Sequence, residues 1–209
     1  MTFDKNNSRI AITVPFFRLL RSQDGLFDKN QRANEPYLVT LAIDSNSKES
    51  PSIAFNSSPF PNVRRGEKVE MLGDGHLVYG PENPGEFVVV SILLMESDNE
   101  YRELGTKLET AIKDSAVDAG LKALMTANAT AGAIGQGLQL ATGLVARILK
   151  GNRDDEVIRT AGTFFRDRPV PYDINRQFTR GNKEAEIAVK VIALSESNGQ
   201  GSAPKCVTL

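Results

Sequence analysis

An uncharged stretch of 24 residues, from Ala123 to Ala146, is the feature that most constrains how this chain can fold. The stretch is rich in alanine and glycine, and Lys122 and Arg147 bracket it. Sequence with the alternating pattern of β-strands lies further along the chain on both sides. We therefore expect a helical hairpin that interrupts an otherwise β-structured domain.

Length and composition are typical of one globular domain that carries an insertion. Of the 209 residues, 40% are apolar and 24% are charged, which suits a chain with a sizeable core. The formal net charge is −1 and tryptophan is absent, so no nucleic-acid partner is expected. The amino terminus lacks the basic start and the long apolar core of a signal peptide. We expect a protein that is soluble or peripherally associated with a membrane.

Several strand-like segments precede the uncharged stretch. They are residues 10–14, 37–43 and 52–55, the short pair 68–72 and 76–79 around a Gly-Asp-Gly turn, and residues 86–95. The last segment, with Phe-Val-Val-Val-Ser-Ile-Leu-Leu at its heart, is apolar on both faces and is predicted to be a central strand. Loops rich in proline, serine and asparagine separate the others.

Helical periodicity begins after Ser97 and Asp98, either of which is a suitable cap. Apolar residues three or four apart predict a first helix, and they are Tyr101, Leu104, Leu108, Ile112 and Ala116. A second helix carries Ile134, Leu138, Ala141, Val145 and Ile148 on one face. Strand patterns return at 157–165, around 172–178 and at 184–194.

The predicted fold class is α+β, an antiparallel β-sandwich of about eight strands with an inserted two-helix hairpin. One domain spans residues 1–195, with strands within 8–96 and 157–195 and the hairpin at 98–150. Residues 196–209 are rich in serine and glycine and are predicted to be a flexible C-terminal tail.

Acidic residues lie in three connections of this predicted sandwich. They are Asp24 and Asp28 between the first two strands, Asp98 after the central strand, and Asp154 and Asp155 before the first strand that follows the hairpin. If the strands alternate up and down, these connections meet at one end. Calcium accepts six to eight oxygen ligands from separate loops, so the five residues form a hypothetical calcium site. The alternative is that they only cap and solubilise loops.

These residues also carry a resemblance to a known family. The order of an acidic loop, Glu35-Pro36-Tyr37-Leu38, Asp98 after a central strand, and Asp154-Asp155-Glu-Val-Ile158 with Gly162 resembles a C-two-type β-sandwich. The resemblance implies an eight-stranded domain, and many members bind calcium at loops of one end and dock on lipid or protein. This chain departs from the family in its helical insertion and in lacking Asp-x-Asp pairs in these loops.

Three functions follow from this interpretation. The preferred one is a non-catalytic module that docks on a protein or lipid surface and responds to calcium through its acidic loops. The alternative is a structural subunit that self-associates through small residues recurring every four positions, namely Ala129, Ala133, Gly137 and Ala141. A toxin-like, membrane-inserting protein ranks lower, because Asn128, Gln136 and Gln139 disfavour insertion of the uncharged stretch.

No pattern in the chain commits to a reaction, and we expect a protein that is not an enzyme. His76 is the single histidine and is predicted to lie in a turn that enters a strand. Cys206 is the single cysteine, and with Val207, Thr208 and Leu209 it fits a prenylation box. A chance match to that box is the alternative.

Overall fold

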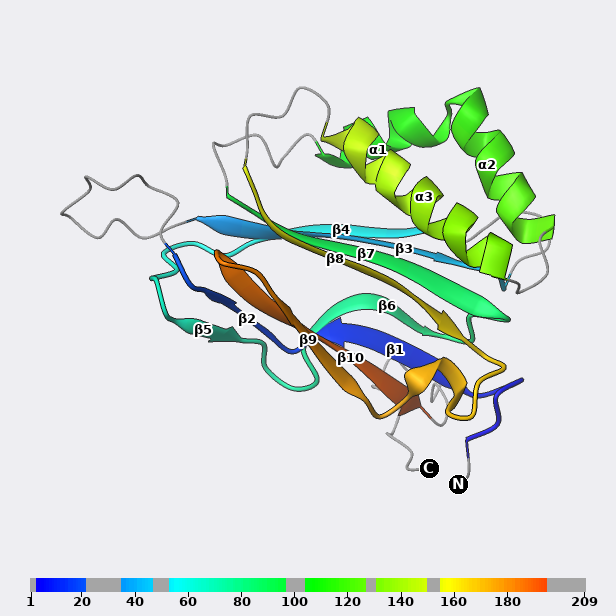
Figure 1. The fold of residues 1–209 in the computed structure, drawn as a ribbon, viewed down its shortest axis with the longest axis horizontal. Coiled ribbons are helices and arrows are strands. Elements are labelled where there is room, and N and C mark those ends of the chain that lie inside the picture. The colour runs from blue at the N-terminus through cyan, green and yellow to red at the C-terminus, as the bar shows by residue number, and fades with distance from the viewer. Residues whose placement is uncertain are drawn as a thin grey trace, which may run out of the picture.

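The computed structural model describes residues 3–21, 35–46, 53–96, 104–126, 131–149 and 155–194. In these residues ten strands form two antiparallel sheets, and helices cover the outer face of one of them (Figure 1). This arrangement is consistent with the predicted β-sandwich.

The first sheet has the order β5-β2-β10-β1-β6, and β9 also pairs with β10. Its strands are β1 (Arg9–Val14), β2 (Phe16–Leu19), β5 (Lys68–Glu70), β6 (His76–Glu82), β9 (Gln177–Gly181) and β10 (Ala185–Leu194). Pro15 separates β1 from β2, and both pair with β10, so they occupy one strand position. β5 and β6 likewise occupy one strand position, because β5 pairs with β2 and β6 pairs with β1 on the side away from β10. With β10 and β9, the six strands therefore fill four positions across the sheet.

The second sheet has the order β4-β3-β7-β8. Its strands are β3 (Pro36–Asp44), β4 (Ile53–Pro59), β7 (Phe87–Glu96) and β8 (Glu156–Phe165). β7 pairs with β3 on one side and with β8 on the other, which confirms the prediction of a central strand at 86–95. The sequence predicts about eight strands. The ten observed strands fill eight positions, because β1 with β2, and β5 with β6, each share one position.

Both faces of the second sheet are apolar because both are buried. Leu38, Val90 and Ile92 point into the core between the two sheets. Their neighbours along the strands, such as Val39 and Val89, point into a second core beneath the helices. The alternation of side chains along a strand thus explains why β3 and β7 read as continuous apolar runs.

The inserted segment contains three helices where the sequence predicts two. They are α1 (Leu104–Ile112), α2 (Ser115–Thr126) and α3 (Ala131–Ile148). The expected first helix divides at Asp114, whose Oδ1 accepts the backbone N–H of Val117 at 3.4 Å. An aspartate in this position caps a new helix, so the chain turns where the apolar periodicity suggested continuity. The prediction of a two-helix hairpin at 98–150 is therefore wrong.

The small residues of α3 are used inside the molecule. Gly137 is buried, and Ala141 lies in the core beneath the helices with Val145. Their small size lets the helix lie close to the sheet. None of the described helices has both the length and the apolar character needed to cross a membrane.

Candidate functional site

The start of β3, the end of β7 and the residue before β8 lie side by side at one end of the second sheet, which we call the loop end. At the loop end, Pro36 at the start of β3 lies opposite Glu96, the last residue of β7. The backbone N–H of Glu96 donates a hydrogen bond of 2.9 Å to the carbonyl of Asp155, just before β8. The connections that carry the predicted calcium ligands are therefore attached side by side, as up-and-down strands require.

The predicted ligands themselves fall mostly outside the described residues. Asp24, Asp28, Asp98 and Asp154 lie there, so their positions remain predictions. Asp155 is described and exposed at the loop end. In the part of the chain that the structure describes, no group of three or more histidine, cysteine, aspartate or glutamate residues could hold a metal ion.

The turn between β9 and β10 ties the two sheets together at the loop end. The Nδ2 of Asn182 donates to the carbonyl of Val157 in β8 at 2.7 Å. The Oδ1 of Asn182 accepts the backbone N–H groups of Glu184 and Ala185, both at 2.8 Å. Sequence reasoning did not single out Asn182, although Gly181-Asn182 is a recognisable turn signal. This turn therefore fixes the start of β8 against the first sheet at the loop end.

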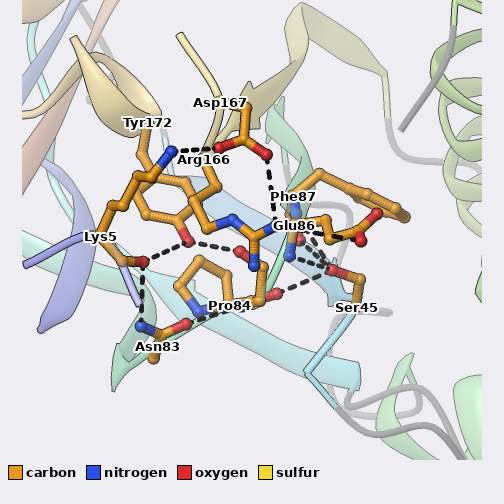
Figure 2. Close-up of polar contacts among 10 residues, drawn as sticks. Lys5, Ser45, Asn83, Pro84, Glu86, Phe87, Arg166, Asp167 and Tyr172 are labelled. Atoms are coloured by element: carbon orange, nitrogen blue, oxygen red, sulfur yellow. Dashed lines mark hydrogen bonds and ion pairs between the residues drawn. The ribbon is translucent and has the colours of Figure 1, made fainter. Parts of the chain in front are cut away.

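A polar network joins four segments at the opposite end of the sandwich, and Figure 2 shows it in close-up. Its centre is Tyr172, in a short helical turn at Pro171–Asp173. The hydroxyl of the fully buried Tyr172 donates to the carbonyl of Gly85 and lies 3.5 Å from that of Lys5. Desolvation raises the pKa of Tyr172, which keeps the hydroxyl a neutral donor.

Ser45 and Asn83 complete this network with backbone groups (Figure 2). The Oγ of Ser45 accepts the N–H groups of Glu86 at 2.7 Å and Phe87 at 3.0 Å. The Nδ2 of Asn83 donates to the carbonyl of Ser8 at 2.9 Å. These bonds pair backbone N–H and carbonyl groups in turns and at strand ends that burial would otherwise leave without partners. Their role is to fix the turns at this end of the sandwich.

Charged groups form the rim of the same network. The Oδ1 of Asp167 lies 2.6 Å from the Nζ of Lys5, and its Oδ2 lies 3.2 Å from a guanidinium nitrogen of Arg166. The hydrogen bond from Lys5, followed by that from Arg166, lowers the pKa of Asp167. Exposed pairs of this kind contribute little to stability, because water and salt screen them. The carboxylate of Asp167 is therefore held in ion pairs, which does not favour a role as an acid or a base.

The helical layer has a surface depression of about 350 Å³ between α1 and α3. Thr106, Thr110 and Lys107 line one side, and Asp114 and Arg147 close the other through an ion pair of 2.7 Å. None of the residues predicted from the sequence to be functional lies there.

His76 begins β6 and is half-buried. Its Nε2 lies 3.4 Å from the Nδ2 of Asn56 in β4. Burial lowers the pKa of His76. Its position next to the Gly-Asp-Gly turn agrees with the sequence interpretation of a turn histidine. Cys206 lies outside the described residues.

Comparison with known proteins adds no functional assignment. No protein-family model matches this chain, and neither curated proteins nor solved structures give a significant match.

Proposed function

We propose that this protein is a non-catalytic binding module with a C-two-like sandwich, and that its loop end is the docking surface. The eight strand positions in two layers of four support the C-two-like part of the proposal. The docking part rests on the loop end, where three connections attach to neighbouring ends of paired strands.

One observation carries the proposal, namely the side-by-side attachment of the three acidic connections. Pro36 pairs with Glu96, and Glu96 is hydrogen-bonded to Asp155. Carboxylates that lie far apart in the sequence can reach one another from such neighbouring attachment points. The proposal is that calcium, which accepts oxygen ligands from several loops, orders these connections for docking.

Assembly through the small-residue row of α3 is the less favoured function. Gly137 and Ala141 are buried within the chain, so they are not available to a second copy. Packing inside the monomer therefore accounts for these two members of the row.

A calorimetric melt in millimolar calcium and then in chelator tests the calcium response. A ligand at 100 times its dissociation constant stabilises a protein by about 2.7 kcal/mol, which raises the melting temperature of a chain of this size by about 5–10 °C. Asp98→Asn and Asp154→Asn are expected to abolish the shift. Asp167→Asn, at the opposite end of the sandwich, is the matched control and is expected to retain it.

Two further measurements separate the alternatives. A melting temperature that depends on protein concentration and not on calcium would contradict the calcium-responsive module and favour an assembly subunit. Co-sedimentation with phosphatidylserine vesicles in calcium distinguishes a lipid surface from a protein partner. Binding that Asp98→Asn removes and Asp167→Asn leaves intact would place the docking surface at the loop end.

A further inference from the structure

β4 forms one edge of the second sheet, and among the described strands it pairs with β3 alone (Figure 1). Its seven residues follow β3 in continuous register from Ile53 to Pro59, without a bulge. None of the seven carries a charge. Edge strands are usually protected against pairing with another chain by charged side chains, bulges, prolines or short length. β4 has only Pro59, at its last position, as a protection of this kind.

The other edge strands of the described residues are better protected. β5 has only three residues, and β6 has register shifts against β1. In β8 the carbonyl of Val157 already accepts a hydrogen bond from the side chain of Asn182. Charged residues occur on all four of these strands, β9 included, and they are Lys68, Glu70, Glu82, Glu156, Arg159 and Arg180. β4 is therefore the described edge that is best suited to accept a further strand.

The ladder between β3 and β4 shows which backbone groups of β4 point outward. The N–H of Phe60 donates to the carbonyl of Pro36 at 2.8 Å, so these two residues form a hydrogen-bonded pair. Such pairs alternate along an antiparallel ladder with pairs that exchange no bond. Every second residue of β4 therefore bonds to β3, beginning with Ser58 opposite Leu38. The residues between them turn their N–H and C=O groups away from β3, and they are Ile53, Phe55 and Ser57.

The outward groups of β4 are complementary to those of a second copy of the same strand. Antiparallel pairing centred on Asn56 puts Phe55 of each copy opposite Ser57 of the other, and both residues present an N–H and a C=O. No like charges meet in this arrangement, because β4 is uncharged. Ile53 and Phe55 are only partly buried against the core beneath the helices, and a neighbouring strand would cover them further.

We propose that this protein forms a twofold dimer in which the β4 strands of two copies pair antiparallel and join their four-stranded sheets into one. The loop ends of the two copies then lie at opposite ends of the joined sheet, because the paired strands run in opposite directions. Neither α3 nor the acidic connections take part in the pairing. The dimer therefore goes beyond the proposed docking function and does not depend on calcium.

Sedimentation equilibrium of the full chain, from micromolar to nearly millimolar concentration, tests the dimer. The mass of the unmodified protein should rise from that of a monomer toward that of a dimer. Ser57→Pro removes one outward N–H and keeps the bonds to β3, since proline is tolerated on the open side of an edge strand. This variant should remain monomeric throughout.

Ser57→Ala is the matched control for the proline variant. It removes the hydroxyl but keeps the outward N–H, so it should dimerise as the unmodified protein does. A monomer mass for the unmodified chain at every concentration would overturn the proposal. Dimerisation of a folded Ser57→Pro variant to the same extent as the unmodified protein would also overturn it.

Amide hydrogen exchange in the unmodified chain is a second measurement that needs no variant. The N–H groups of Phe55 and Ser57 should exchange several-fold more slowly in concentrated than in dilute protein. Those of Asn56 and Ser58 bond to β3 in monomer and dimer alike, so their exchange should change far less. Exchange of Phe55 and Ser57 that does not depend on concentration, in a protein whose mass does, would contradict pairing through β4.

The calorimetric melt keeps this proposal separate from the proposed function. Asp98→Asn should leave dimerisation unchanged, and Ser57→Pro should leave the calcium response unchanged. A chain that dimerises through β4 and does not respond to calcium would support the dimer and contradict the calcium-responsive module. A monomeric chain that responds to calcium would contradict the dimer alone.

Discussion

The hydroxyl of Tyr79 donates a hydrogen bond of 2.6 Å to the Oδ2 of Asp44 inside the sandwich. Tyr79 belongs to β6 in the first sheet and Asp44 ends β3 in the second, so this bond joins the two layers. Asp44 is completely buried, and its Oδ1 accepts the backbone N–H of Asn46 at 3.1 Å. A buried carboxylate is tolerated only where donors of this kind replace water.

Loss of the Tyr79 hydroxyl should destabilise the protein markedly. Tyr79→Phe removes a donor from a buried charge, and we expect a loss of about 1.5–3 kcal/mol in the free energy of unfolding. Urea denaturation measures it, with an unchanged m-value. A double-mutant cycle with Asp44→Ala, which removes the acceptor, isolates the pairwise energy. A coupling near zero would show that the two groups do not interact in solution.

Stability should fall at alkaline pH because of two buried tyrosines. Desolvation, reinforced for Tyr79 by its bond to Asp44, raises the pKa values of Tyr79 and Tyr172 above the ordinary 10.0. Below pH 10 both residues are neutral in the folded and unfolded states. Above it only the unfolded state ionises, so the free energy of unfolding decreases. Denaturation at pH 8 and pH 11 measures this loss, which should be smaller in Tyr79→Phe with Tyr172→Phe. Equal losses in both proteins would contradict the prediction.

Two glycines of one turn should respond very differently to substitution. Gly73 and Gly75 both have positive φ, at 65° and 106°. A methyl group at Gly75 would lie 2.7 Å from the carbonyl oxygen of Val14, whereas one at Gly73 meets nothing within 4 Å. Gly73→Ala should cost about 1 kcal/mol from backbone strain alone. Gly75→Ala should cost more than about 2 kcal/mol, because Val14 must also move. Thermal unfolding of both variants gives the comparison, and equal effects would argue against this turn geometry.

Gly143→Ala should stabilise the helical layer. Gly143 is exposed on α3, and a methyl group there meets nothing within 4 Å. Alanine in a helix is favoured over glycine by about 0.5–1 kcal/mol. Gly120→Ala in α2 is the control, because its methyl group would lie 3.0 Å from the Cδ1 of Leu140 and should gain less. Urea denaturation measures both changes. A loss of stability at Gly143 would indicate that this position contacts something else.

The single histidine should titrate below its ordinary pKa. Desolvation lowers the pKa of His76 from 6.5, so protonation is easier in the unfolded state. Its contribution to stability is complete above pH 6.5 and is lost as the pH falls through the lower pKa of the folded state. One imidazole signal in a proton NMR titration reports the folded value directly. His76→Gln should remove this step from the pH dependence of unfolding. A midpoint at or above 6.5 would contradict the burial of the ring.

The sequence predicted which loops of the candidate site lie at the same end of the sandwich, and not the contacts between their residues. Acidic residues in loops and the alternation of strands were sufficient to predict that the attachment points of Pro36, Glu96 and Asp155 would be adjacent. The tie between Asn182 and Val157 was not predictable in this way. A hydrogen bond between an amide and a distant carbonyl leaves no periodic signal in the sequence.

Local and periodic features are what the sequence by itself determined. The continuous apolar run of β7 predicted a central strand, and the loops between apolar segments predicted two packed sheets. These predictions succeed because burial on one or both faces imposes a side-chain period within each strand. The division at Asp114 was missed because apolar residues keep a helical spacing across it, although aspartate favours the N-cap of a helix over its interior.

Contacts between distant segments were decided only by the tertiary structure. Packing on the sheet, rather than any property of α3 itself, determines that Gly137 and Ala141 are buried inside the monomer. In the same way Tyr172 meets Gly85, and Tyr79 meets Asp44, because folding brings segments together that are far apart in the chain. A side chain's hydrogen-bond partner depends on which surfaces meet, and sequence spacing does not encode that choice.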